Sequence, residues 1–212
     1  MKVILLNGSR REKGCTYTAL SVVADTLKEN GIDAEIVHAL PDDAIVDAVA
    51  EKMKTADGLV IGSPVYWASP SGEIISFMDK LAGKAGADLT HKVGATVTSA
   101  RRAGTTATLD VLNKYLSYHQ MVSVASNYWP MVHGNTPEDV KKDEEGLQIM
   151  RTLGRNMAWI LKCIEAGKKA GAAVVCLTLS LVWNSMWVTA RSDAPSSFRL
   201  SNWKAHCPRR LM

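Results

Sequence analysis

The chain has 212 residues, a length that suits one domain or one domain with an appendage. Its hydrophobic content of 47% and charged content of 22% are ordinary for a globular protein with a sizeable core. The net charge of +4 is uneven, because residues 172–212 hold five basic residues and one acidic residue, while residues 1–171 hold 20 of each kind. A neutral main segment argues against a nucleic-acid-binding protein, which needs a basic face.

The beginning of the chain and its cysteines favour a cytoplasmic protein. After Met1 and Lys2 only four apolar residues precede Asn7, too few for the hydrophobic part of a secretory signal. The four cysteines are widely separated and include no CxxC pair: Cys15, Cys163, Cys176 and Cys207. The sequence therefore supports neither a zinc site nor an iron–sulfur cluster, and we expect no metal site and a reducing compartment.

Apolar runs alternate with helical patterns along the first 171 residues. Short, almost wholly apolar runs are typical of strands buried on both faces, and they occupy residues 2–7, 34–39, 59–63, 93–99 and 121–126. Each run precedes an amphipathic pattern, and these patterns predict helices over residues 16–31, 42–58, 71–83, 105–119 and 143–167.

Five strands, each followed by a helix, require parallel pairing with right-handed crossovers. We therefore expect an α/β fold: a three-layer, doubly wound sandwich around a five-stranded parallel sheet of flavodoxin-like order 2-1-3-4-5. Ligands of such sheets bind beyond the carboxyl ends of the strands, at the switch between strands 1 and 3. Three loops fall at that edge, at residues 8–15, 64–70 and 99–104.

The first loop, NGSRREKGCT (7–16), has the composition of an anion site. It lacks the GxGxxG of dinucleotide-binding loops and the lysine of a triphosphate-binding loop. No arginine follows Cys15 closely, which argues against a cysteine phosphatase. A single phosphate remains, held by Ser9, Thr16, Arg11 and the amino end of the next helix. The alternative is a plain capping turn with solvated basic residues.

The other two loops offer a place for a flat apolar ligand. GSPVYWASPSG (62–72) carries Tyr66 and Trp67 at a strand end, and TSARRAGT (98–105) carries Arg101 and Arg102 beside Gly104. Taken alone, the aromatic residues could instead pack on the next helix, and the arginines could simply be solvated. Together with a phosphate at the first loop, the three loops describe a site for flavin mononucleotide (FMN).

A family resemblance is carried by five segments: NGSRREKGCT, GSPVYWASPSGEIISFMDK, TSARRAGTT, NYWPMVHG and DEEGLQIMRTLGRNMAWILKCIEAGK. They resemble the NAD(P)H-dependent FMN reductase branch of the flavodoxin-like superfamily, over residues 1–171. The resemblance implies a bound FMN with NAD(P)H as co-substrate. It places the phosphate on Ser9, Arg11, Gly14, Cys15 and Thr16. It places the ring between two further groups, Pro64, Val65, Tyr66 and Trp67 on one side and Ser99, Ala100, Arg101 and Gly104 on the other.

The resemblance also implies a homodimer or tetramer, in which Tyr128, Trp129 and His133 could approach a neighbour's flavin or could pack under a loop. Two residues depart from the pattern. Cys15 stands where related loops commonly have Asn, and it is a weaker hydrogen-bonding group, so we expect looser FMN binding. Pro130 stands where the related pattern often has Asn, which removes a donor near the expected interface.

The expected activity is electron transfer from NAD(P)H to a small acceptor such as a quinone, a nitro or azo compound, or free flavin. We expect no catalytic acid or base, because the cofactor carries this chemistry. One alternative is a flavodoxin-like electron carrier, although carriers tend to be acidic and this domain is neutral. Others are an iron–sulfur flavoprotein, which needs a compact cysteine cluster, and a flavin-binding protein without turnover.

Residues 172–212 form a C-terminal segment that does not belong to the FMN-binding domain expected over residues 1–171. They contain a 19-residue apolar run (172–190) and three of the six tryptophans. We interpret them as an atypical, non-homologous or out-of-frame extension. The alternatives are an arm that packs on a partner subunit and a membrane anchor, against which the polar residues within the run argue.

Overall fold

The computed structural model describes residues 1–172, and Met1–Gly171 form one compact unit. The extension expected over residues 172–212 lies outside the described residues, apart from the first of them. In chain order the elements are β1 (Lys2–Asn7), α1 (Cys15–Glu29), β2 (Asp33–His38), α2 (Asp43–Met53), β3 (Gly58–Tyr66), β4 (Ser69–Pro70), α3 (Gly72–Leu89), β5 (Val93–Ala100), α4 (Thr105–Tyr118), β6 (Val122–Ser123), β7 (Met131–His133), α5 (Pro137–Val140) and α6 (Glu144–Lys169).

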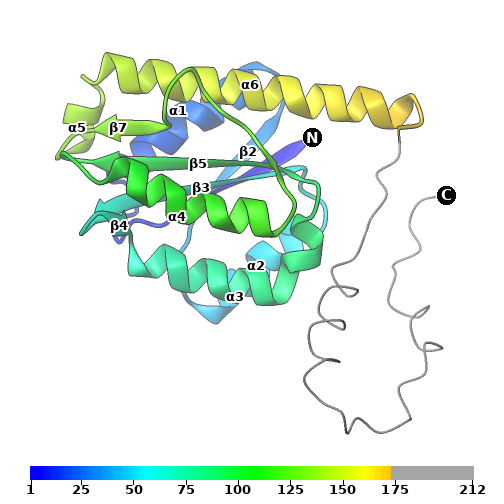
Figure 1. Ribbon diagram of the computed structural model, residues 1–212, viewed down its shortest axis with the longest axis horizontal. Helices are drawn as coiled ribbons and strands as arrows, with labels where there is room; N and C mark the ends of the chain where they lie inside the picture. The colour runs from blue at the N-terminus through cyan, green and yellow to red at the C-terminus, as the bar shows by residue number, and fades with distance from the viewer. Residues whose placement is uncertain (173–212) are drawn as a thin grey trace, which may run out of the picture. The chain divides into compact units, whose positions relative to one another are not determined.

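The strands form a parallel sheet of order β2-β1-β3-β5-β6 (Figure 1). Neighbouring strands pair in parallel throughout this path, for example Leu5 with both Ile36 and Val60. With β5 and β6 as the fourth and fifth strands, this is the doubly wound, flavodoxin-like order that the sequence predicts. The short strand β4 is an addition, antiparallel to the end of β3.

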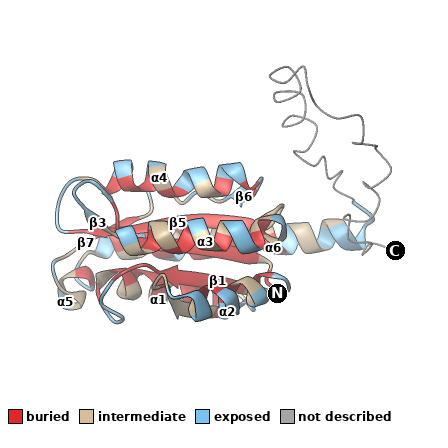
Figure 2. Ribbon diagram, turned by 90° about the horizontal axis from the view of Figure 1, so that it is seen from below, coloured by how far each residue is buried: buried red, intermediate tan, exposed pale blue. Residues whose placement is uncertain are grey.

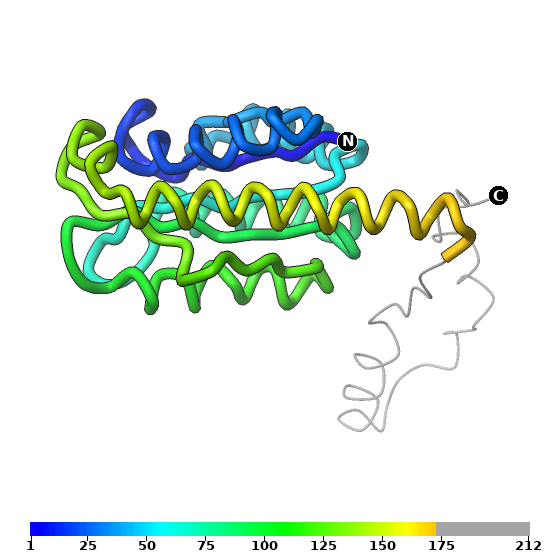
Figure 3. Tube along the Cα trace, turned by 90° about the horizontal axis from the view of Figure 1, so that it is seen from above, coloured from blue at the N-terminus to red at the C-terminus, as the bar shows by residue number. Residues whose placement is uncertain are grey.

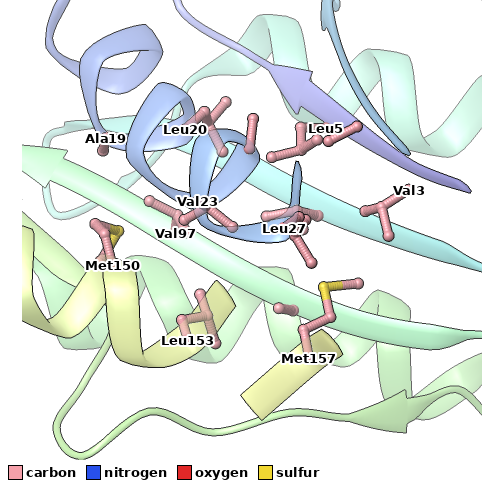
Figure 4. Packing of buried hydrophobic residues seen from close by; sticks show 14 of the residues in the cluster. Val3, Leu5, Ala19, Leu20, Val23, Leu27, Val97, Met150, Leu153 and Met157 are labelled. Carbon is pink, nitrogen blue, oxygen red and sulfur yellow. The ribbon is translucent and has the colours of Figure 1, made fainter. Parts of the chain in front are cut away.

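Helices cover both faces of the sheet. α1 and α6 cover one face, while α2, α3 and α4 cover the other, so the strands are buried and the helices expose their outer sides (Figure 2). Figure 4 shows Leu20 and Val23 of α1 packed with Leu153 of α6 around β5. α6 runs unbroken along the sheet (Figure 3). The buried side chains of α1 and α6 recur every three or four residues, which is why these segments form amphipathic helices.

The fifth strand is shorter than the sequence predicts. Residues 121–126 were expected to form one strand, but only Val122 and Ser123 pair with β5, and β7 takes over as the neighbour of β5 farther along. Between them the chain leaves the sheet edge and is held by α6. The Ser126 hydroxyl donates to the Ile149 carbonyl at 2.7 Å, and the Asn156 amide donates to the Ala125 carbonyl at 2.8 Å.

α3 is longer than the sequence predicts. The pattern favoured an end at Gly83, whereas the helix continues to Leu89 with one non-helical residue, Ala85. Ala85 and Leu89 are both buried against the core of that face, so apolar packing outweighs the poor helix propensity of the two glycines in this turn.

Candidate flavin site

The three loops singled out in the sequence lie at the carboxyl edge of β1, β3 and β5. In Figure 1 this is the end of the molecule where β4, β7 and α5 lie. β1 is flanked by β2 on one side and β3 on the other, and the chain order reverses between β1 and β3. Ligands of doubly wound sheets bind at such a switch point.

Two side chains from strand ends fix the shape of the first loop. Asn7, which is 1% exposed, donates from its amide to the Glu12 carbonyl at 2.8 Å and accepts from the Ser9 amide at 3.2 Å. At the end of β2, His38 Nε2 lies 2.7 Å from the Ser9 carbonyl oxygen. The Ser9 hydroxyl accepts from the Arg11 amide at 3.1 Å. The loop is therefore held in a fixed conformation by contacts of its own chain.

α1 begins directly after this loop at Cys15; Gly14 is the residue that precedes the helix, and no side chain of residues 1–172 caps it. A Cβ at Gly14 would stand 3.2 Å from the Arg11 Cβ and 3.5 Å from the Ser9 hydroxyl oxygen. The glycine thus keeps the space between loop and helix open. The first N–H groups of a helix have no partner within it, and their partial positive charge attracts anions. Ser9 and Thr16 are buried beside this helix start, and Arg11 is exposed.

Thr16 and Ser99 connect the first and third loops. Their hydroxyl oxygens lie 2.8 Å apart, and both side chains are buried. Ser99 and Ala100 end β5, and the exposed Arg101 and Arg102 follow. The residues that were expected to hold a phosphate and those expected beside a ring therefore meet at one edge of the sheet.

The second loop is a tight hairpin. Val65 pairs with Pro70 and Tyr66 with Ser69, so Trp67 and Ala68 form a two-residue turn. Both turn residues have positive φ angles, 53° and 57°, as turns of this kind require. The turn raises Trp67 until it is 99% exposed. Trp67 therefore packs on no part of residues 1–172, which is contrary to the alternative that it packs on the next helix.

Gly104 brings the third loop against this hairpin. Its φ of +100° is in the region that favours glycine, and a Cβ there would lie 2.8 Å from the Ala68 Cα and 2.9 Å from the Val65 Cγ1. α4 starts at Gly104, again without a side-chain cap. The predicted ring-binding residues Val65 and Gly104 are thus neighbours.

Arg10, which the sequence analysis did not single out, links the first loop to α3. Its guanidinium lies 2.5 Å from Glu73 Oε1 and 5.7 Å from the centre of the Tyr66 ring. Burial, the largest single effect, raises the pKa of Glu73, but the hydrogen bonds from Arg10 and a backbone amide together lower the pKa below its ordinary value. The hydrogen bond to Glu73 raises the pKa of Arg10 in turn. Arg10 therefore orders the base of the hairpin.

Cys15 points away from the first loop. Its Sγ lies 3.7 Å from the Gly134 carbonyl oxygen, next to β7, and burial raises the pKa of the thiol. A neutral thiol that donates to a carbonyl is a poor nucleophile. Only the backbone of Cys15 lies at the helix start. Its side chain therefore takes no direct part in the candidate phosphate cradle, by which we mean the donors of the first loop and of the first turn of α1.

Two buried serines support the site and were missed in the sequence. The Ser71 hydroxyl donates to the Gly8 carbonyl at 2.6 Å, and the Ser71 amide donates to the Ser63 hydroxyl at 2.9 Å. These bonds tie the first loop to the end of β3 and the start of α3. Their signal in the sequence was weak, because serines are common in all loops, whereas Asn7 at the end of an apolar strand could have been noticed.

Tyr128 and Trp129 lie beside a groove to which the three loops contribute no lining residue. Their rings meet edge to face at 4.8 Å, and each is about half exposed. With the segment that leaves the sheet edge, they line a groove of about 570 Å³ against Thr96 and Asn113. His133 is exposed, and its amide donates to Asp143 at 2.6 Å. The approach of these residues to a partner's flavin stays a prediction.

Residues 1–172 contain neither a cluster of metal-binding side chains nor a helix suited to a membrane. No three His, Cys, Asp or Glu side chains in this part of the chain are grouped so that they could hold a metal ion. No helix of this part is long and apolar enough to cross a membrane.

Comparisons with known proteins bear on the family and the fold of the chain. The sequence profile described as NADPH-dependent FMN reductase matches residues 1–136. An iron–sulfur flavoprotein of Methanocaldococcus jannaschii is 30% identical over 194 residues, covering 78% of this chain and 100% of that protein. FMN reductase (NADPH) of Escherichia coli is 31% identical over 98 residues, covering 40% of this chain and 50% of that protein. A flavodoxin, WrbA-like protein of Agrobacterium tumefaciens has the same fold, with a TM-score of 0.60 at 19% identity over 76% of this chain and 97% of that one.

Proposed function

Because the chain belongs to the NADPH-dependent FMN reductase family, we propose that this flavin oxidoreductase binds FMN at the three loops and passes electrons from NAD(P)H to a small acceptor. Overall, NAD(P)H and a proton would reduce a quinone to a hydroquinone and release NAD(P)⁺. Nitro and azo compounds and free flavin are the other acceptors we consider. When bound, FMN supplies the redox chemistry, because it can take electrons from the nicotinamide and pass them on to the acceptor.

One observation carries the proposal. Of the six helices in residues 1–172, α1 and α4 begin at glycines without a side-chain cap. The other four each begin with a side-chain oxygen that accepts from the first turn: Asp42, Ser71, Thr136 and Asp143. Both uncapped helices start at the candidate site. Their free N–H groups suit a ligand with a phosphate at one end and a polar ring at the other.

The side chains around α1 fit the phosphate of FMN. Ser9 and Thr16 offer hydroxyls, and Arg11 offers a cation that forms no ion pair within residues 1–172. Gly14 leaves room for the phosphate to approach the backbone, as the Cβ distances to Arg11 and Ser9 indicate. A monoester phosphate accepts hydrogen bonds from such a set of donors without needing a lysine or a metal.

The second and third loops fit the ring. The hairpin presents Val65 beside Gly104, where a larger residue would be strained, with Tyr66 next along the strand, and the residues from Ser99 to Arg101 adjoin them. Apolar and aromatic groups with a few polar partners are the usual lining of a small-ligand site. These residues would bind and orient the ring and keep water from one of its faces.

Arg101 and Arg102 support a preference for NADPH over NADH. Both are exposed on the rim, and neither forms an ion pair with another residue of the described chain. Arginine binds phosphate well because its planar group can donate two parallel hydrogen bonds. In Arg101→Ala and Arg102→Ala, kcat/KM for NADPH should fall while that for NADH changes little. An equal fall for both nucleotides would contradict the assignment.

We also propose that the chain acts in the cytoplasm as a homodimer or tetramer. The exposed pair Tyr128 and Trp129, with Tyr118 and Trp159 also more than half exposed, supports the assembly into a dimer or tetramer. Large aromatic side chains are enriched in protein–protein interfaces. Sedimentation of the full chain and of Trp129→Ala tests the assembly, and an unchanged oligomer in the variant would place the interface elsewhere.

A single experiment tests the proposed activity. The purified protein should show the absorbance of bound flavin, and NADPH added without air should bleach it. Later addition of a quinone should restore the absorbance. A protein that binds flavin but is bleached by neither NADPH nor NADH would be a carrier or a binding protein and not a reductase.

A further inference from the structure

The relationship to an iron–sulfur flavoprotein raises the question of whether this chain can hold a cluster. Fe–S clusters are generally held by four cysteine thiolates. The chain contains four cysteines in total, so a cluster within one chain would need all of them. Two of these, Cys15 and Cys163, lie in the described part of the chain and are both free.

Cys15 and Cys163 lie near opposite ends of the domain. α1 and α6 pack side by side, and Gly154 of α6 touches Thr26 of α1, where a Cβ would stand 2.8 Å from the Thr26 Cβ. Both helices start at the carboxyl edge of the sheet and run in the same direction (Figures 1 and 3). At about 1.5 Å per residue, Cys15 is roughly 16 Å before this contact and Cys163 roughly 14 Å beyond it.

The two sulfur atoms are therefore separated by a distance on the order of 30 Å, several times farther than two ligands of one cluster can lie. The two thiols also differ in their surroundings. Cys15 is half-buried, donates to the Gly134 carbonyl, and has its pKa raised by burial. Cys163 is exposed on α6.

The length of the match shows a second difference between this chain and that relative. The alignment with the archaeal relative spans 194 residues and all of that protein, yet uses only 78% of this 212-residue chain. The relative therefore carries a few tens of residues that have no counterpart here. At the carboxyl edge this chain makes short connections, such as residues 39–42 between β2 and α2 and residues 101–104 between β5 and α4.

We infer that this chain is a member of the family without an iron–sulfur cluster, and that its acceptor takes electrons directly from the flavin. This inference rests on the proposed function for the flavin. The site has the access that it needs, since Trp67, Arg101 and Arg102 are exposed on its rim. A quinone is such an acceptor, because it takes two electrons and two protons at once from NADPH and a proton.

The test compares iron content with electron transfer in the full chain. Protein purified without air should contain flavin but far less than one iron and one sulfide per chain, also after incubation with ferrous iron and sulfide followed by desalting. Retained iron and sulfide in stoichiometric amounts, with the electron paramagnetic resonance of a reduced cluster, would overturn the inference, whether the cluster lies in one chain or between two.

A triple cysteine variant tests whether electrons leave through a cysteine-bound cluster or directly from the flavin. Cys163→Ser, Cys176→Ser and Cys207→Ser together should leave the flavin content and the rate of benzoquinone reduction unchanged. The parent should reduce benzoquinone faster than it reduces cytochrome c. Loss of acceptor reduction in the variant, with bleaching by NADPH retained, would contradict the inference. If NADPH bleaches the flavin in neither protein, the proposed function fails, while the iron measurement still decides the presence of a cluster.

Discussion

The hydroxyl oxygens of Thr16 and Ser99 lie 2.8 Å apart, both buried, and they join the first turn of α1 to the end of β5. Removal of one hydroxyl leaves the other buried without a partner, which costs about 1–3 kcal/mol. We therefore expect Thr16→Val and Ser99→Ala each to lower the free energy of unfolding of the apoprotein by that amount, as measured in urea.

The double variant distinguishes stability from binding. When both hydroxyls are replaced, no buried group is left unsatisfied, so most of the lost stability should return. FMN affinity, measured by quenching of flavin fluorescence, should stay weak because Thr16 can no longer donate to the phosphate. A double variant that binds FMN as tightly as the parent would remove Thr16 from the cradle.

Asn7 is expected to act through the first loop. In Asn7→Ala the Glu12 carbonyl and the Ser9 amide both lose a partner, so the loop should lose its fixed shape before FMN binds. We expect the Kd for FMN to rise by about tenfold or more, since each bond of this kind is worth about 1 kcal/mol. Asn156→Ala is the matched control, because it also removes an amide donor to a carbonyl but far from the site. Equal effects of the two variants would contradict the role of Asn7.

The order of the sheet could be predicted from the sequence, but the detail of its edge could not. Each main strand is a run of apolar residues followed by an amphipathic helix, and such local patterns are enough to establish parallel pairing. The end of β6 depends instead on two hydrogen bonds with α6, in which Ser126 donates to Ile149 and Asn156 donates to Ala125. Contacts between residues that are distant in the chain produce no periodic pattern in the sequence.

The candidate site shows the same division. The sequence predicted which three loops would meet, because the carboxyl ends of parallel strands share an edge. It did not predict how they are held, since His38 and Ser71 reach the first loop from other elements. The hairpin at Trp67 was also missed, because a tryptophan in a left-handed turn runs against the usual preference for Gly or Asn.

Gly104 tests the contact between the hairpin and α4. In Gly104→Ala the new Cβ would meet the Ala68 backbone, and φ is unfavourable for alanine, so we expect a loss of about 1–3 kcal/mol in unfolding free energy. FMN binding should weaken as the hairpin shifts. Gly83→Ala is the control, because no atom of another part of residues 1–172 would lie within 4 Å of its Cβ and the site is helical, so it should gain about 0.5–1 kcal/mol. A stable Gly104→Ala with normal FMN affinity would show that the hairpin is free to move.

The pair of Arg10 and Glu73 should make stability depend on pH. The folded-state pKa of Glu73 lies below its ordinary value of 4.5, so the folded state favours the ionised carboxylate. The stability that results is present above pH 4.5 and is lost as the pH falls through the folded-state pKa. Arg10→Gln should therefore be less stable than the parent at pH 7, and the difference should be smaller at pH 3, where more of the carboxyl group is protonated.

A second substitution isolates this carboxylate. In a Glu73→Gln background no charge is left to titrate, so Arg10→Gln should change the urea midpoint by the same amount at both pH values. A difference between pH 3 and pH 7 that persists in that background would assign the pH dependence to another group.

Cys15 offers the sharpest test of the phosphate cradle, because its backbone belongs to the helix start while its side chain turns to Gly134. An asparagine amide is a stronger donor than a thiol, so Cys15→Asn should hold the Gly134 carbonyl better and fix the first turn of α1 in place. We expect a lower Kd for FMN, measured by fluorescence titration, and a slower loss of flavin on dilution. Cys15→Ala, which has no donor, should bind FMN no more tightly than the parent. If Cys15→Asn also fails to bind FMN more tightly, the side chain at this position does not limit flavin affinity. Residue 15 would then contribute to the phosphate cradle through its backbone alone.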